Sequence, residues 1–68
     1  MSIFSKRLIE LRKLNKYTQR YMATLLDIKQ SSYLRYENGT AEPTHANLVK
    51  LADALDVSTD YLLGRGEY

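Results

Sequence analysis

Hydrophobic residues recur every three or four positions along the chain, which is the spacing of helices that bury one face. The first such stripe consists of Phe4, Leu8 and Leu11, extended by Leu14. Ser5 is a residue type that favours helix N-caps, because its hydroxyl accepts a hydrogen bond from the first turn. We therefore expect a first helix from about residue 5 to residue 15.

Two further helices are predicted between residues 18 and 39. Thr18 is a suitable N-cap for a helix that ends near Leu26, and Asp27 tolerates the left-handed turn that often follows a helix. The next helix runs from about residue 30 to residue 38, and Gly39 closes it because glycine adopts that conformation without strain. The residues expected to face inward are Met22, Ala23, Leu26, Tyr33 and Tyr36, with Ile28 in the turn.

A fourth and a fifth helix follow the loop at residues 40–43. Thr44 is the N-cap of the fourth, which runs to about Leu55, and Asp56 repeats the expected left-handed stop. Ser58 caps the short fifth helix and Gly64 ends it. The inward-facing candidates are Leu48, Leu51, Ala52, Leu55, Tyr61, Leu62 and Leu63.

Length and composition favour a single all-α domain. The chain has 68 residues, well below the size at which hydrophobic cores divide. Three glycines and one proline are too few for a sandwich or barrel of many short strands. We expect a five-helix bundle over residues 1–64, with a short tail at residues 65–68.

Several classes of protein are disfavoured at this stage. There is no cysteine, and hence no disulfide framework and no thiolate metal site. Apolar runs extend over only about two residues, against the ~18 that a membrane span needs. The N-terminus runs at once into charged residues, so no signal peptide is expected. These features predict a cytoplasmic protein.

The net charge of +2 conceals a strong asymmetry. Residues 1–36 contain eight lysines and arginines against two acidic residues, a net charge of +6. Residues 37–68 contain two against six, a net charge of −4. A basic half of this kind indicates a polyanionic partner, although solvated charges that happen to segregate are an alternative.

The segment from residue 18 to residue 39 has the spacing of a helix-turn-helix, two short helices around a turn of about three residues. The outward stripe of its second helix is polar and basic and contains no acidic residue. Glutamine, serine and arginine are residue types that bond to base edges and phosphates. An ordinary solvated helix face is the alternative. The stripe comprises Ser31, Leu34, Arg35 and Asn38, with Gln30 at its leading end.

An ordered set of residues across all five helices resembles the lambda-repressor-like, Cro/cI-type helix-turn-helix family, also called the XRE type. The resemblance covers residues 5–64 and implies a five-helix bundle that binds double-stranded operator DNA, usually as a symmetric homodimer, and regulates transcription. We expect a repressor. The matching residues are Leu11-Arg12, Thr18-Gln19, Ala23, Leu26, Tyr36-Glu37-Asn38-Gly39, Pro43, Leu51-Ala52, Ala54-Leu55-Asp56-Val57-Ser58 and Asp60-Tyr61-Leu62-Leu63-Gly64.

The resemblance also assigns roles to individual residues. The helix-turn-helix motif spans about residues 19–38, and its recognition helix, the helix that enters the major groove, spans about residues 30–38. Gln30 and Ser31 are expected to meet base edges, and Leu34 a thymine methyl group. The full set of expected DNA-binding residues is Thr18, Gln19, Lys29, Gln30, Ser31, Ser32, Leu34, Arg35, Asn38 and Thr40.

Two structural roles follow from the same resemblance. Arg12 and Glu37 are expected to form an ion pair that joins the first helix to the end of the recognition helix. The dimer interface is expected around Tyr61, Leu62 and Leu63, although Leu62 or Leu63 must also serve the core.

The sequence departs from the family pattern at four positions. Asp27 and Asp56 stand where a helix-ending glycine is usual, and Lys29 replaces the usual serine or threonine cap. Tyr33 replaces a branched aliphatic residue, so its hydroxyl needs a partner in the core.

Enzyme chemistry, cofactors and small-molecule ligands are not indicated. His45 is the only histidine, without companions for a metal site, and there is no Gly-rich phosphate loop or paired carboxylates. The alternative function is a protein-interaction module, resembling an antitoxin or anti-repressor, that uses the stripe formed by Tyr17, Tyr21 and Leu25.

Overall fold

The computed structural model describes residues 2–66, and every regular element in that range is a helix. Neighbouring helices are joined by short turns and loops. None of the described helices is long and apolar enough to cross a membrane. The five helices are α1 (Ile3–Leu14), α2 (Gln19–Leu26), α3 (Gln30–Asn38), α4 (His45–Leu55) and α5 (Thr59–Leu62).

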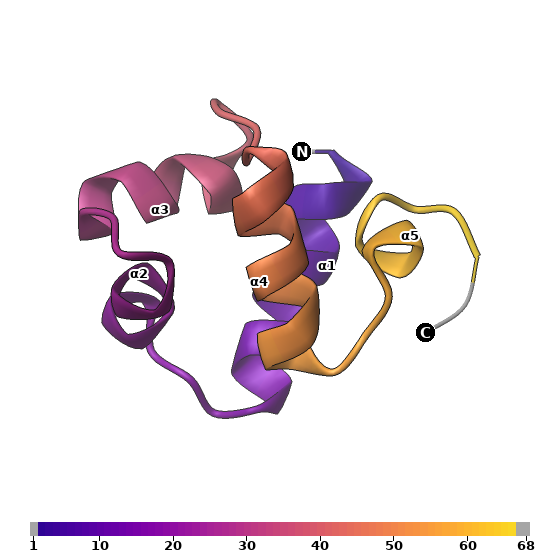
Figure 1. The fold of residues 1–68 in the computed structure, drawn as a ribbon, viewed down its shortest axis with the longest axis horizontal. Coiled ribbons are helices and arrows are strands. Elements are labelled where there is room, and N and C mark those ends of the chain that lie inside the picture. Colours follow the sequence, from indigo (N-terminus) through magenta and orange to yellow (C-terminus); the bar gives the residue numbers. More distant parts are fainter. Residues whose placement is uncertain (1, 67–68) are drawn as a thin grey trace.

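The helices are arranged so that α2 and α3 lie at one end of the molecule and α5 at the other, with α1 and α4 between them (Figure 1). One hydrophobic core connects them. The predicted inward faces of α2, α3 and α4 are confirmed, apart from Leu48, which is only partly buried against the core. The buried core consists of Phe4, Leu8, Leu11, Met22, Ala23, Leu26, Tyr33, Tyr36, Leu51, Ala52, Leu55 and Leu62.

The start of α1 differs from the prediction. Ser2 is the N-cap and accepts a hydrogen bond from the backbone N–H of Ser5, so the helix begins at Ile3. Ser5 is buried instead, and its hydroxyl donates to the backbone carbonyl of Tyr36 over 2.8 Å. It therefore ties α1 to α3. Leu14 is wrong as a core residue, because it lies on the last turn of α1 and is 76% exposed.

The predicted helix ends are confirmed at three left-handed residues. Asp27 follows α2 with φ 55°, Asp56 follows α4 with φ 56°, and Gly39 follows α3 with φ 83°. Glycine adopts this conformation freely, whereas the two aspartates do so at a cost in backbone strain. The turn at Asp27 sets the angle between α2 and α3, and therefore the direction in which α3 projects.

Candidate nucleic-acid interface

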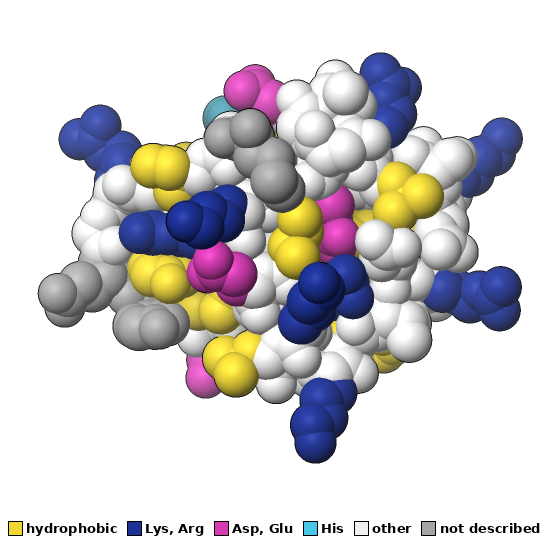
Figure 2. Space-filling view, turned by 180° about the vertical axis from the view of Figure 1, so that it is seen from behind, with side chains coloured by type: hydrophobic (Ala, Val, Ile, Leu, Met, Phe, Trp, Pro, Cys, Tyr) yellow, Lys and Arg dark blue, Asp and Glu magenta, His cyan; other side chains and the backbone are white. Residues whose placement is uncertain are grey.

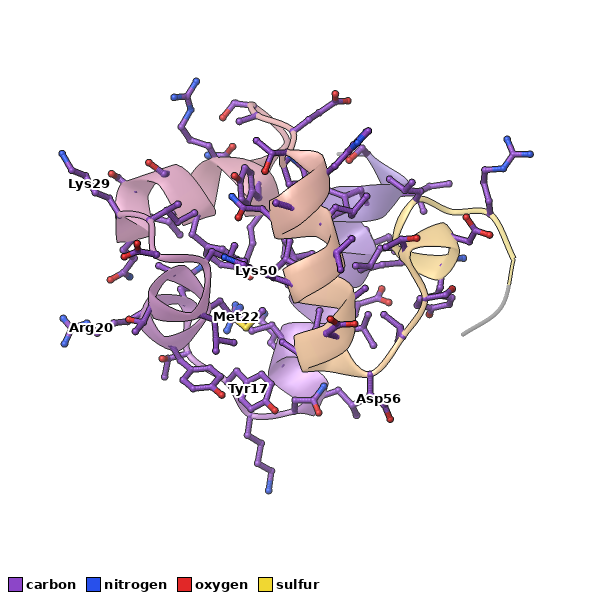
Figure 3. All side chains as sticks on the ribbon, in the orientation of Figure 1. Tyr17, Arg20, Met22, Lys29, Lys50 and Asp56 are labelled. Atoms are coloured by element: carbon purple, nitrogen blue, oxygen red, sulfur yellow. The ribbon has the colours of Figure 1, made fainter. Side chains whose placement is uncertain are left out.

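The helix-turn-helix is formed by α2, a turn at residues 27–29 and α3. Thr18 caps α2 by accepting a hydrogen bond from the backbone N–H of Tyr21 over 3.0 Å. Met22 points from α2 into the interior, whereas Arg20 and Lys29 project away from the molecule (Figure 3). The motif is thus anchored on one side by the core and presents basic side chains on the other.

The start of α3 is suited to an anionic partner. Lys29 is its N-cap residue, and within the described residues its side chain makes no capping hydrogen bond. The first turn contains no acidic residue. Because the N-terminal end of a helix carries partial positive charge, Lys29 and the helix dipole favour a negative charge at the same place.

The side chains of α3 that are expected to face DNA are all at least partly accessible. Gln30, Ser31 and Arg35 are exposed, whereas Ser32 and Leu34 are partly buried. None of these five side chains belongs to the core. The inward face of the same helix is formed by Tyr33 and Tyr36. One face of α3 therefore packs in the core, and the opposite face is available to a partner.

Asn38 and Thr40 form a local turn at the end of α3. The Asn38 Oδ1 atom accepts hydrogen bonds from the backbone N–H of Thr40 over 3.1 Å and from its hydroxyl over 2.7 Å. Both side chains are exposed. The Asn38 oxygen is therefore used within the turn, and its amide N–H groups are the donors it can offer to a phosphate.

The ion pair expected between Arg12 and Glu37 is present. Arg12 Nε donates to Glu37 Oε2 over 2.6 Å, and Arg12 Nη2 to Glu37 Oε1 over 3.3 Å. Arg12 Nη1 also donates to the backbone carbonyl of Tyr17 over 3.0 Å. One guanidinium therefore joins α1, the turn before α2 and the last turn of α3.

Two further side chains donate to the same carboxylate. Tyr33 Oη lies 2.5 Å from Glu37 Oε2, and Gln19 Nε2 lies 3.1 Å from Glu37 Oε1. The Tyr33 bond supplies the partner that its buried hydroxyl requires. The tyrosine and the glutamate are four residues apart on one helix, so their spacing was a signal for this contact. No sequence signal indicates the Gln19 contact, because it depends on how α2 docks.

These contacts alter the ionisation of the network. Burial alone raises the pKa of the Glu37 carboxyl, but hydrogen bonds from Arg12, Tyr33 and Gln19 outweigh it and hold that pKa below its ordinary value. The hydrogen bond to Glu37 raises the pKa of Arg12. Burial, together with the bond to Glu37, raises the pKa of Tyr33. The network is therefore a charged pair with a neutral tyrosine at neutral pH.

A hollow that we call the α3 hollow lies between α1, the start of α2 and the second half of α3. Its lining brings Leu34 and Asn38 of the expected DNA-facing stripe together with Gln19 and Glu37 of the network. Ile9, which the sequence did not single out, forms its α1 side. The rear view of the molecule shows hydrophobic patches among projecting lysine and arginine side chains (Figure 2).

The residues expected at a dimer interface fall into different environments. Leu62, the last residue of α5, is fully buried in the core, so it is the leucine that serves the core and is wrong as an interface residue. Leu63 is 50% exposed, so the prediction that it faces inward is wrong. Tyr61 is partly buried, with the Arg7 guanidinium 4.1 Å from the centre of its ring and Arg7 Nη1 donating to its backbone carbonyl.

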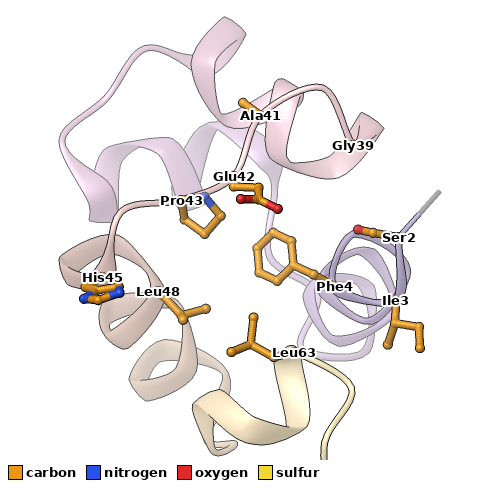
Figure 4. Close-up of a pocket in the computed structure, with 10 residues that line it drawn as sticks. All are labelled: Ser2, Ile3, Phe4, Gly39, Ala41, Glu42, Pro43, His45, Leu48 and Leu63. Carbon is orange, nitrogen blue, oxygen red and sulfur yellow. The ribbon is translucent and has the colours of Figure 1, made fainter.

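Leu63 borders a second depression, the α5 hollow, formed by the start of α1, the loop before α4 and α4 itself. Phe4, Pro43 and Leu63 lie around its centre, the Glu42 side chain lies beside Pro43 and points toward Phe4, and His45 lies at its edge (Figure 4). His45 is exposed, and the described residues contain no group of three or more histidine, cysteine, aspartate or glutamate side chains placed to hold a metal ion.

The stripe formed by Tyr17, Tyr21 and Leu25 is only partly a free surface, and Tyr17 precedes α2 rather than lying on it. Tyr17 packs against the core, and its ring centroid lies 4.7 Å from that of Tyr21. Tyr21 and Leu25 are 45% and 39% exposed. Two exposed side chains remain, which is a smaller patch than the sequence indicated.

Comparison with known proteins identifies relatives over nearly the whole chain. The transcriptional repressor RstR of the cryptic phage CTXφ from Vibrio cholerae is 48% identical over 60 residues, which are 88% of this chain and 54% of the relative. The transcriptional regulator AnsR of Bacillus subtilis is 46% identical over 59 residues, 87% of this chain and 51% of the relative. The chain thus spans about half the length of the curated relatives it matches.

Solved structures give the same result. The P22 c2 repressor, solved in complex with a synthetic operator, is 28% identical with a TM-score of 0.84, covering 93% of this chain and 96% of the repressor. The restriction-modification controller protein C.AhdI from Aeromonas hydrophila is 33% identical with a TM-score of 0.78, covering 88% and 91%. The helix-turn-helix family model HTH_3 matches residues 8–62. The chain belongs to this helix-turn-helix family, whose relatives include transcriptional regulators and repressors.

Proposed function

We propose that this chain binds double-stranded operator DNA sequence-specifically and represses transcription, with α3 inserted in the major groove. The observation that carries the proposal is the exposed, acid-free face of α3, which begins at Lys29 and the positive end of the helix dipole. The relatives named as repressors, and the P22 repressor solved with an operator, support the same function.

The side chains of α3 divide into two tasks. Gln30 and Ser31 are exposed in the first turn, the part of a recognition helix that meets base edges, and a glutamine amide pairs bidentately with adenine. Lys29 and Arg35 carry the charges that meet phosphates. Thr18, Gln19, Asn38 and Thr40 add phosphate contacts, while Ser32 and Leu34 contact sugar or a thymine methyl group.

Two copies bind one operator as a symmetric dimer, with half-sites ~10 base pairs apart. Leu63, rather than Leu62, contributes from α5, because its side chain is half exposed beside the α5 hollow. Tyr61 lies in α5, at the same end of the molecule. The apolar character of this region supports a contact with a second copy of the chain.

Selection of binding sites from a random duplex library by the purified chain tests the function. We expect one palindromic sequence to be enriched, and its affinity to fall steeply with salt as counterions are released from the phosphates. Binding to the selected duplex that is no tighter than to a scrambled duplex would contradict the proposal. A partner protein bound with little salt dependence would favour the alternative, a protein-interaction module that uses Tyr21 and Leu25.

A further inference from the structure

The Glu37 carboxylate accepts four hydrogen bonds, two on each oxygen. Oε2 accepts hydrogen bonds from Arg12 Nε and Tyr33 Oη. Oε1 accepts hydrogen bonds from Arg12 Nη2 and Gln19 Nε2. A carboxylate has about four lone-pair positions, so the acceptor capacity of Glu37 is used in full. Two of these four donor atoms belong to Arg12 on α1, one belongs to Tyr33 on α3 itself, and the fourth belongs to Gln19 at the start of α2. The bond from Gln19 is therefore not needed to hold α1 against α3.

The contact with Gln19 fixes which end of the glutamine amide faces Glu37. An ionised carboxylate only accepts hydrogen bonds, so the NH₂ group of Gln19 must point toward it. The carbonyl oxygen and one remaining N–H are left for other partners. Gln19 is partly buried, and it lines the α3 hollow together with Leu34 and Asn38. The amide is therefore held next to the surface that we propose meets DNA.

We propose that Glu37 is a positioning residue for DNA binding, which orients the Gln19 amide so that its second N–H donates to a backbone phosphate. Phosphate oxygens only accept hydrogen bonds, and the remaining Nε2–H is the part of the Gln19 side chain that can donate to them. The inference rests on the proposed function and adds to it a link between the Arg12–Glu37 pair and the DNA-facing surface.

The arrangement explains how an acidic side chain is tolerated beside a phosphate. Arg12 neutralises Glu37 at 2.6 Å, and the Glu37 side chain is 6% exposed. The Gln19 amide lines the α3 hollow beside this carboxylate, and it offers a donor where the carboxylate itself would repel a phosphate. Gln19→Glu would replace this donor with a second carboxylate, which can donate neither to Glu37 nor to a phosphate.

A double-mutant cycle on operator affinity tests the positioning role. The four proteins are the wild type, Gln19→Ala, Glu37→Asp and the double variant, each measured on the selected duplex. Aspartate keeps the charge for Arg12 but withdraws the carboxylate by one methylene. We expect Gln19→Ala to weaken binding about tenfold in the wild type, and less than about twofold in the Glu37→Asp background. Equal losses in both backgrounds would overturn the inference.

Tyr33→Phe supplies the matched control. It removes a donor from Oε2 of the same carboxylate but leaves the Gln19 contact with Oε1 in place. Both background changes weaken the network, but only Glu37→Asp should remove the effect of Gln19→Ala on affinity. An effect that disappears in both backgrounds would show that loss of stability, rather than positioning, is responsible, and would overturn the inference.

If Glu37→Asp does not fold, a measurement on the wild-type protein tests whether Glu37 holds the Gln19 amide in solution. The side-chain amide hydrogens of Gln19 should exchange with water more slowly than those of Gln30, which is exposed. Equal exchange rates would overturn the inference. If the wild type does not prefer the selected duplex to a scrambled one, the proposed function fails instead, and that result is distinct from a cycle without coupling.

Discussion

Tyr33 Oη lies 2.5 Å from Glu37 Oε2, one turn further along α3, so the phenol that α3 buries in the core is bonded to a carboxylate. The Tyr33 side chain is completely buried. A buried hydroxyl without a hydrogen-bond partner destabilises the fold. Here the partner is a charged carboxylate that also accepts a hydrogen bond from Arg12. The core on the inner side of α3 is thereby connected to the polar network at its end.

Removing this hydroxyl should destabilise the protein without a large change in shape. Tyr33→Phe deletes one bond to a charged acceptor, and we expect the free energy of unfolding to fall by about 1–2 kcal/mol. Urea denaturation followed by circular dichroism measures the change. Tyr21→Phe is the control, because Tyr21 is exposed and should have little effect. Equal effects of the two substitutions would contradict the role assigned to the bond.

The Arg12–Glu37 pair should behave as one unit in unfolding experiments. Arg12→Met leaves a buried carboxylate without its counter-charge, and we expect a loss of ~3 kcal/mol, the lower end for buried pairs because Glu37 borders a hollow. Glu37→Gln should destabilise in the same way. The double variant should lose clearly less than the sum of the two single losses. Additive and small losses would argue against an energetic pairing.

The lowered pKa of Glu37 predicts how stability depends on pH. Because the folded protein holds this carboxyl ionised below the ordinary value of 4.5, the unfolded chain takes up the proton first as the pH falls. The contribution of Glu37 is therefore complete above about pH 4.5 and is lost as the pH falls through the folded pKa. Between pH 6 and pH 3, the unfolding free energy of the wild type should fall more than that of Glu37→Gln. Parallel curves would contradict this pKa shift.

The two left-handed aspartates should respond to glycine in the same direction. Asp27→Gly removes both the strain of φ 55° and a negative charge at the C-terminal end of α2, where the helix dipole disfavours it. We expect stabilisation by about 0.5–1 kcal/mol, and a similar gain for Asp56→Gly. Lys50→Gly is the control: Lys50 lies within α4, where glycine is unfavourable, so this substitution should lower the stability of the protein. Thermal unfolding that shows destabilisation by Asp27→Gly would contradict the strain argument.

Most of the fold could be predicted because its helix boundaries are marked by local signals. Thr18, Thr44 and Ser58 cap helices as their residue types indicate, and Gly39 occupies the left-handed position. Ser5 shows the limit of such signals: the same residue type can cap a helix or be buried, and tertiary packing against Tyr36 decides between them.

The site could be predicted only in part, for a similar physical reason. The exposed residues of α3 follow from helical spacing, and the Arg12–Glu37 pair follows from the family resemblance. The contact between Gln19 and Glu37 joins two helices, and its existence depends on their docking angle. The environment of Leu62 likewise depends on packing, because adjacent residues of a four-residue helix point in different directions.

The proposed phosphate contact at Lys29 should affect all DNA sequences alike. Lys29 is exposed at the start of α3, and its contact with a phosphate carries no sequence information. Lys29→Ala should weaken binding to operator and scrambled duplexes by similar factors, and it should lower the dependence of log affinity on log salt by roughly one. Binding isotherms at several salt concentrations measure this slope. A loss confined to the operator would contradict a phosphate contact.

Substitution of Gln30 tests the insertion of α3 in the major groove most directly. Gln30→Ala, measured on the selected operator and on a scrambled duplex over the same range of salt, should cost ~1–3 kcal/mol on the operator and far less on the scrambled duplex. The salt slope should stay nearly unchanged, because no charge is removed. Equal weakening of both duplexes by Gln30→Ala would contradict the assignment of α3 as the helix that distinguishes one DNA sequence from another.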